Sequence, residues 1–205
     1  MTTSTTSNMP DLQRSPGHQV LAAAGKTVLR PGGRTATEQL FRWASRAANG
    51  RSPLQGIPLQ PGNTVLELAS SFGLNAIALA QRFGVNVVGV ERHPDSVARS
   101  HANIEAAGLQ DRVRIVEGNI FNLDELSEQF AEQFAEQFAE QLDCVLAEAI
   151  LTMQSPAGKA KLLRLIHDRL KSGGVFLSHE MVVKGNEESN EDTVRQALTE
   201  TIRVN

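Results

Sequence analysis

Two carboxylates stand where short apolar segments of this chain end. Glu67 closes the segment 64–67 and precedes a run of small residues, and Glu91 closes a second apolar segment one strand–helix–strand unit later. Small residues let a backbone approach a flat nucleoside ligand closely at a strand-to-helix turn. A carboxylate at the next strand end can accept hydrogen bonds from two vicinal ribose hydroxyls. The first carboxylate suits a ligand that is positively charged there better than one that brings a pyrophosphate.

The small residues after Glu67 match a glycine-rich pattern in their spacing. Ala69, Ser71 and Gly73 stand where an E-x-G-x-G-x-G pattern has its three glycines, and only Gly73 keeps full freedom at positive φ. A buried strand that simply meets a helix also favours small residues. A solvated strand end is the corresponding alternative for Glu91.

A third candidate follows the next apolar segment. In Gly118-Asn119-Ile120, the amide of Asn119 can hydrogen-bond the edge of an adenine while Ile120 packs against its ring. A plain Gly-Asn turn is the alternative interpretation.

Later strand ends carry groups that can orient or deprotonate a substrate. Glu148 follows the fourth predicted strand, and His179 and Glu180 end the fifth. All three belong to the carboxyl edge of a parallel sheet, where ligands bind. His179 and Glu180 cannot both face the same side, because successive strand residues point in opposite directions. No one of the three is singled out as a general base.

The region before the first strand contains a Pro-Gly-Gly turn next to an arginine. Arg30 precedes Gly32 and Gly33, and Thr35 or Thr37 can cap a following helix. A flexible entry lid that carries an arginine would serve a small anionic substrate or the carboxylate of a cofactor. An ordinary surface turn is the alternative.

Strand-like and helix-like segments alternate through the rest of the chain, and the strands are apolar rather than alternating. This pattern predicts an α/β fold of the Rossmann-like, doubly wound type, with helices on both faces of a mainly parallel sheet of about five strands. The predicted strands are 65–67, 85–91, 113–116, 143–147 and 175–178, and the predicted helices are 37–48, 74–83, 93–106 and 157–170, with a turn at 171–174.

Composition and pattern divide the chain into three predicted parts. Residues 1–15 are rich in Ser and Thr and are predicted to be a disordered tail, residues 16–60 a helical lid segment, and residues 61–205 the main domain. Residues 128–141 repeat Glu-Gln-Phe-Ala, which indicates either an expansion that lengthens one helix or a partner-binding surface. A polar loop at 186–191 and a helical stretch at 193–202 end the chain.

Composition narrows the class of protein. The chain has 205 residues, 40% hydrophobic and 21% charged, with a formal net charge of -3, which gives no basic field for nucleic acid or anionic lipid. A single cysteine and the lack of a long apolar run or signal sequence predict a cytoplasmic protein that does not enter a membrane. No metal constellation is evident.

Taken in order, these motifs resemble the class I S-adenosylmethionine-dependent methyltransferases, particularly their small-molecule branch, over residues 60–182. Leu-Lys-Ser-Gly-Gly at 170–174 is similar to the family's L-K-P-G-G turn before strand five. The resemblance implies that the loop from Glu67 to Gly73 holds the methionine part, Glu91 the ribose, and Asn119 with Ile120 the adenine of S-adenosylmethionine. The family usually has Asp where Asn119 stands.

The resemblance also implies the reaction and an architecture. The reaction would be methyl transfer to a small-molecule acceptor, without any obligatory metal or nucleophile constellation. The family's sheet gains an antiparallel terminal hairpin that this chain lacks, so the chain is expected to be incomplete at its C-terminus. An NAD(P)-dependent Rossmann oxidoreductase and a non-catalytic remnant of the fold remain as alternatives, and oligomeric state is not indicated.

Overall fold

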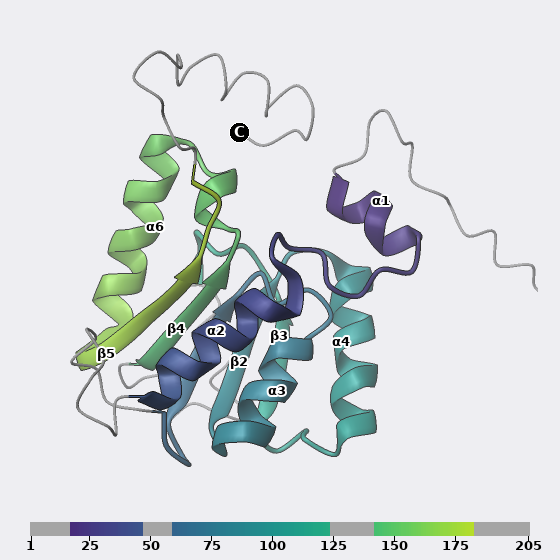
Figure 1. Cartoon of the computed structure of the whole chain (residues 1–205), viewed down its shortest axis with the longest axis horizontal. Coiled ribbons are helices and arrows are strands. Elements are labelled where there is room, and N and C mark those ends of the chain that lie inside the picture. Colours follow the sequence, from purple (N-terminus) through teal and green to yellow (C-terminus); the bar gives the residue numbers. More distant parts are fainter. Residues whose placement is uncertain (1–16, 47–58, 124–141, 183–205) are drawn as a thin grey trace, which may run out of the picture.

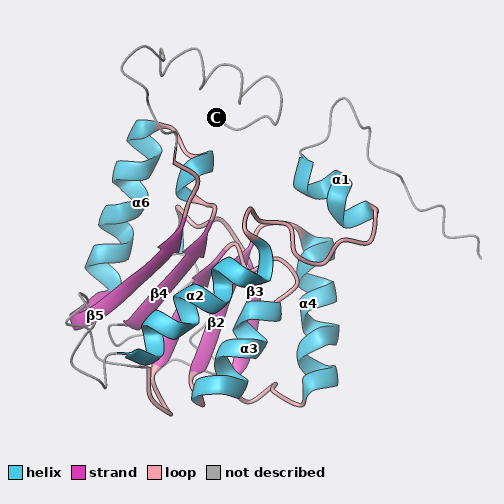
Figure 2. Cartoon of the chain, viewed as in Figure 1, coloured by secondary structure: helices cyan, strands magenta, loops and turns pink. Residues whose placement is uncertain are grey.

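In a computed structural model of the chain, one sheet of five parallel strands lies between layers of helices (Figures 1 and 2). The structure describes residues 17–46, 59–123 and 142–182. The strand order is β3-β2-β1-β4-β5, and every neighbouring pair is parallel. The strands are β1 Thr64–Leu68, β2 Asn86–Glu91, β3 Val113–Glu117, β4 Leu142–Glu148 and β5 Leu170–His179. The predicted Rossmann-like fold class is confirmed.

The helices cover both faces of this sheet. They are α1 Gly17–Ala23, α2 Gly33–Arg46, α3 Leu74–Phe83, α4 Pro94–Ala107 and α6 Pro156–Arg169, with a 3-10 helix, η2, at Leu151–Met153. In Figure 1, α2 crosses in front of the strands beside α3 and α4. The predicted helices 74–83 and 93–106 are confirmed, to within one residue, as α3 and α4, and Gly84 and Gly108 close them in the left-handed conformation.

Two apolar clusters, one on each face, make the core. Alternate strand residues contribute to opposite clusters: Val65 and Cys144 pack with α2, α3 and α4, whereas Leu66 and Val145 pack with α6. Strands that are apolar on both sides require this double coverage, because parallel sheets bury both faces. The arrangement brings the carboxyl ends of β1, β2, β4 and β5 to one edge of the sheet.

The first predicted helix begins earlier than expected. α2 starts at Gly33 rather than at residue 37, because the Pro31-Gly32 turn leads directly into it. Thr35 and Thr37 therefore lie inside the helix, and the prediction that one of them caps it is wrong.

The turn predicted at 170–174 lies inside β5 rather than before it, with Gly173 at φ 82°. α6 ends at Arg169, and β5 begins at once with Leu170. Leu142 pairs with Leu170 and Cys144 pairs with Val175, so the extra residues of β5 form an irregularity opposite a single residue of β4. Because Leu170 pairs with β4, β5 begins before the residues whose composition predicts a turn.

Several predictions fall on residues outside the described ranges. These are the tail at 1–15, the repeat at 128–141, the loop at 186–191 and the helix at 193–202.

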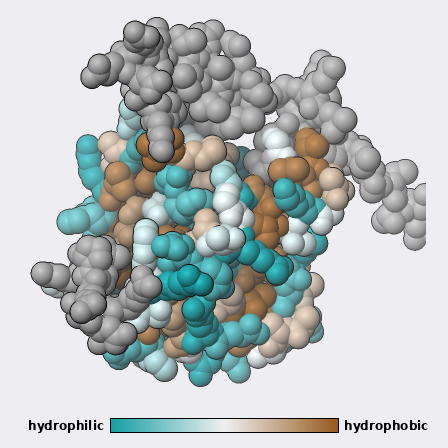
Figure 3. Space-filling model, viewed as in Figure 1, coloured by the Kyte–Doolittle hydropathy of each residue, from teal (hydrophilic) through white to brown (hydrophobic). Residues whose placement is uncertain are grey.

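Hydrophilic and hydrophobic residues intermingle on the face shown in Figure 3. Within the described ranges, no helix combines the length and the apolar character needed to cross a membrane.

Candidate functional site

The loop after β1 adopts an unusual backbone. Ala69, Ser71 and Gly73 all have positive φ, at 55°, 51° and 71°. These are the three positions that the sequence pattern assigns to glycine, and two of them hold this conformation despite carrying a side chain. We call residues 69–73 the β1 loop. Its path winds as the glycine-rich pattern requires, although it has only one glycine.

Close packing holds the β1 loop against the sheet. The Ser70 amide donates to the carbonyl of Val90 at 3.0 Å, and a Cβ on Gly89 would lie only 2.0 Å from Ser70 Oγ. Gly89 therefore leaves room for Ser70 to sit directly on β2. On the far side, Asn103 of α4 donates to the carbonyl of Phe72 at 2.9 Å. The loop is fixed between β2 and α4.

Glu91 ends β2 beside this loop. Its side chain accepts the amide of Ser71 at 2.8 Å and the amide of His93 at 2.9 Å, one on each oxygen. Glu91 is 6% exposed. A carboxylate offers about four acceptor sites, so about two remain for further donors such as ribose hydroxyls.

Glu67 is the most unusual charged residue of the site. It is 4% exposed, and its Oε2 is buried with no hydrogen-bond partner in the described part of the chain. Burial, the largest cause, and the charge of Glu148 raise the pKa of Glu67 to about 7, against the lowering effects of Ser70, Asn75 and Arg30. A buried carboxyl with an unused oxygen suits a ligand that brings a donor or a positive charge.

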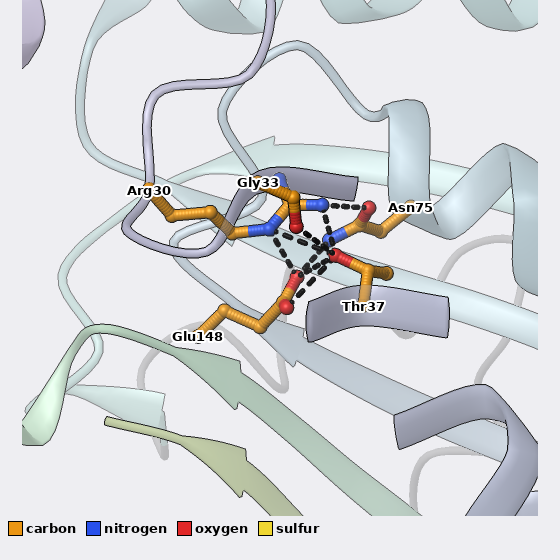
Figure 4. Close-up of polar contacts among 5 residues, drawn as sticks. All are labelled: Arg30, Gly33, Thr37, Asn75 and Glu148. Carbon is orange, nitrogen blue, oxygen red and sulfur yellow. Dashed lines mark hydrogen bonds and ion pairs between the residues drawn. The ribbon is translucent and has the colours of Figure 1, made fainter. Parts of the chain in front are cut away.

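A polar cluster ties the segment before α2 to the end of β4 (Figure 4). Arg30 Nε lies 2.6 Å from Glu148 Oε2, and the side-chain amide of Asn75 donates to the same oxygen at 2.6 Å. Thr37 donates to Glu148 Oε1 at 2.9 Å, and Arg30 donates to Thr37 and to Asn75. We call Arg30, Thr37, Asn75 and Glu148 the Arg30 cluster. It joins three regions that are far apart in the sequence: the segment from Arg30 to Thr37, Asn75 at the start of α3, and Glu148 at the end of β4.

The turn that carries Arg30 is tight, as predicted. The Gly33 amide donates to the Arg30 carbonyl at 3.3 Å, with Pro31 and Gly32 between them. Gly32 has φ 71°, the positive value that a type II turn, in which proline is common at the second position, requires of its third residue. A Cβ on Gly32 would also lie 3.1 Å from the His179 ring, so the turn packs directly on that histidine.

His179 and Glu180 separate as the strand alternation predicts. His179 pairs with Glu148 in the sheet register, and its buried Nδ1 has no hydrogen-bond partner among the described residues. Glu180 instead accepts the amides of Ile150, Leu151 and Thr152 at the start of η2. Glu180 is therefore a structural anchor, whereas His179 shares a face with Glu148.

The residues that follow β3, Asn119 and Ile120, contact their own turn and the core. Asn119 is exposed, and its Oδ1 accepts the amide of Phe121 at 3.0 Å, while Ile120 packs against the core on the α6 face. Asn119 is thus exposed at the end of β3, where its side chain orders the following turn. Among the described residues, no group of three or more His, Cys, Asp and Glu could hold a metal ion.

The structure thus brings together most of the predicted candidates and adds others. The carboxyl edge of the sheet brings together the β1 loop, Glu67, Glu91, Glu148, His179 and Arg30. Gly32 lies against His179, and Gly33 and Thr35 belong to the first turn of α2. Sequence reasoning missed Ser70 and Asn75, and it misassigned Thr37. A polar residue one place into the helix that follows a small-residue loop was the available signal for Asn75.

Comparison with known proteins assigns this arrangement to a family. A family model described as a methyltransferase domain matches residues 59–203. The chain belongs to this methyltransferase domain family. An uncharacterized protein of Haemophilus influenzae is 34% identical over 187 residues, which are 91% of this chain and 64% of that protein.

Solved structures share the fold of this methyltransferase domain. A SAM-dependent methyltransferase from Geobacter sulfurreducens, solved with S-adenosyl-L-homocysteine, has a TM-score of 0.54 at 19% identity, covering 82% of this chain and 56% of that chain. The (4+2)-cyclase SpnF also has a TM-score of 0.54, at 18% identity, covering 74% and 47%. The methyltransferase domain spans less than two thirds of the length of each of these three proteins. At such identities the likeness shows the fold, and the chemistry has to be argued from the site.

Proposed function

We propose that this chain binds S-adenosylmethionine and transfers its methyl group to a small-molecule acceptor. The observation that carries the proposal is the β1 loop, whose left-handed residues Ala69, Ser71 and Gly73 lie between Glu67 and Glu91. That combination suits a nucleoside whose attached chain is positively charged, since a carboxylate and not a nest of amides precedes the loop.

The residues present fit this cofactor at Glu67, whose buried Oε2 has no hydrogen-bond partner among the described residues and lies at the edge of the sheet. In the proposal, Glu67 and the β1 loop hold the methionine part, Glu91 the ribose hydroxyls, and Asn119 with Ile120 the adenine.

S-adenosylmethionine supplies a methyl group that its sulfonium has already activated. The chain therefore has to align, shield and, where the acceptor needs it, remove a proton. Arg30 and Thr37 bring the segment before α2 over Glu148, which makes that segment the proposed lid over the acceptor. Glu148 is engaged by three side chains, so its proposed role is to position the lid.

His179 is the proposed group on the acceptor side. Its buried Nδ1 lacks a hydrogen-bond partner among the described residues, and its ring lies against Gly32 of the proposed lid. A neutral imidazole there can accept a proton from an acceptor hydroxyl or amine. Substituting His179→Ala should lower kcat while leaving the affinity for S-adenosylhomocysteine unchanged.

The acceptor class and the location of the protein are further parts of the proposal. A formal net charge of -3 and a single cysteine, Cys144, favour a small acceptor rather than nucleic acid, and a cytoplasmic setting.

The test is a transfer assay with methyl-labelled S-adenosylmethionine and a fractionated cell extract. Label should enter the low-molecular-weight fraction with the wild-type chain, and more slowly with Glu91→Ala when S-adenosylmethionine is limiting. Label in the nucleic-acid or protein fraction would contradict the small-molecule acceptor. A chain that binds S-adenosylhomocysteine but labels nothing would be a non-catalytic remnant of the fold.

A further inference from the structure

Three titratable side chains share one face at the carboxyl edge of the sheet. In the sheet register Glu67 pairs with Leu146, two residues before Glu148, and Glu148 pairs with His179. Residues two apart on a strand, and residues paired across parallel strands, face the same side. Glu67, Glu148 and His179 therefore continue the rows that α2 and α3 cover.

The arginine beside these three side chains, Arg30, forms its ion pair with Glu148. Arg30 is bonded to Glu148 at 2.6 Å, and Thr37 and Asn75 add hydrogen bonds to the same carboxylate. Glu67 has no such partner for its Oε2 among the described residues. Glu67 lies on the same face as the carboxylate of Glu148, which is already paired with Arg30.

Among the described residues, the other titratable groups of the neighbouring strands on this face supply no counter-charge to Glu67. Glu91 of β2 is held by two backbone amides, and its strand neighbour Gly89, which pairs with Glu67, has no side chain. On β4, burial raises the pKa of the Cys144 thiol to about 12, so Cys144 is neutral. His179 of β5 lies beyond Glu148 from Glu67.

We propose that Glu67 holds a proton in the ligand-free protein and releases it when the ammonium group at the methionine end of the cofactor binds beside it. This inference rests on the proposed function. The O–H bond of the Glu67 carboxyl breaks, the proton passes to the buffer, and the carboxylate that remains faces the ligand's ammonium group. Glu67 thereby selects a ligand that brings an ammonium group, and it makes the affinity for that ligand depend on pH.

The direction of that dependence follows from the burial of Glu67. Its pKa is raised to about 7, mainly by burial and then by the charge of Glu148. Below that value, binding must also remove a proton, so affinity falls as pH falls. Affinity for S-adenosylhomocysteine, which carries the same ammonium group, should rise about fivefold from pH 6 to pH 7.

The test is calorimetric titration of the full chain with S-adenosylhomocysteine in two buffers of different ionisation enthalpy. The difference in heat gives the protons released: about half a proton at pH 7 and close to one at pH 6 are expected for the wild type. Glu67→Gln should release none, whereas Glu105→Gln, an exposed carboxyl on α4, should behave as the wild type. 5′-Methylthioadenosine, which lacks the amino-acid part, should release none from any of the three proteins.

Each other result counts against the inference. Equal heats in both buffers with the wild type, or unchanged release from Glu67→Gln, would overturn it, and so would equal release with 5′-methylthioadenosine. The wild-type measurement needs no variant to fold. Failure of S-adenosylhomocysteine to bind at all would instead overturn the proposed function, so the two failures are distinguishable.

Discussion

The β1 loop and the Arg30 cluster lie at the same edge of the sheet but are built in opposite ways. The β1 loop is local in sequence: five successive residues, two of them left-handed without being glycine, are held by β2 and α4. The Arg30 cluster joins a turn, two helices and a strand end through side chains. One half of the site is therefore set by backbone path, and the other half by charge and hydrogen bonds. Mutations should affect the two halves through different physics.

The largest effect should come from breaking the cluster. Arg30→Met should lower the free energy of unfolding by about 3–4 kcal/mol, because it leaves the buried carboxylate of Glu148 without its counter-charge. Denaturant unfolding measures this loss. The double variant Arg30→Met/Glu148→Gln should recover most of it, since it removes the charge as well. A single variant within about 0.5 kcal/mol of the wild type would show that the ion pair does not hold the segment in place.

Glu67 lies between the two regions, and it should make the stability of the protein depend on pH. The folded state binds its proton up to about pH 7, whereas the unfolded carboxyl loses it near 4.5, so the ligand-free wild type should lose stability as pH rises between these values. Relative to Glu67→Gln, the loss should total about 3 kcal/mol. Unfolding of both proteins, and of Glu105→Gln as control, at pH 5 and pH 8 measures it. Parallel pH profiles of the wild type and Glu67→Gln would mean that Glu67 titrates normally.

The β1 loop should be sensitive to volume rather than to charge. Gly89→Ala places a Cβ 2.0 Å from Ser70 Oγ and should cost about 2 kcal/mol of stability through overpacking. Adding Ser70→Gly should restore part of the loss, because the remaining contact is with the flexible end of Ile115. An additive double variant, measured by thermal or denaturant unfolding, would show that Ser70 does not sit against Gly89.

The smallest effect should be a gain. Ala69 and Ser71 hold positive φ without being glycine, so Ala69→Gly should stabilise the chain by up to about 1 kcal/mol through relief of strain. Ala24→Gly, at an exposed position after α1, is the matched control and should bring no gain. If Ala69→Gly destabilises the protein, the left-handed backbone at residue 69 is not strained.

The same contrast explains what the sequence could predict. The strands, the helix ends at Gly84 and Gly108, and the edge positions of Glu67 and Glu91 depend on local patterns, which the sequence displays directly. Thr37 of α2 and Asn75 of α3 gain their roles only when the fold brings both side chains to Glu148 at the end of β4. The start of β5 was missed because pairing of Leu170 with Leu142 outweighs the turn preference of Ser172 and Gly173. Long-range pairing leaves no mark in a local window of sequence.

The central claim is that the β1 loop and Glu91 form a site for S-adenosylmethionine, and calorimetric titration with S-adenosylhomocysteine tests it most directly. The wild-type chain should bind S-adenosylhomocysteine and not NADH. Glu91→Ala should weaken that binding by on the order of 1–3 kcal/mol, through loss of charge-assisted hydrogen bonds, and Glu105→Gln should not. No binding by the wild type, binding of NADH alone, or an unchanged affinity in Glu91→Ala would contradict the claim.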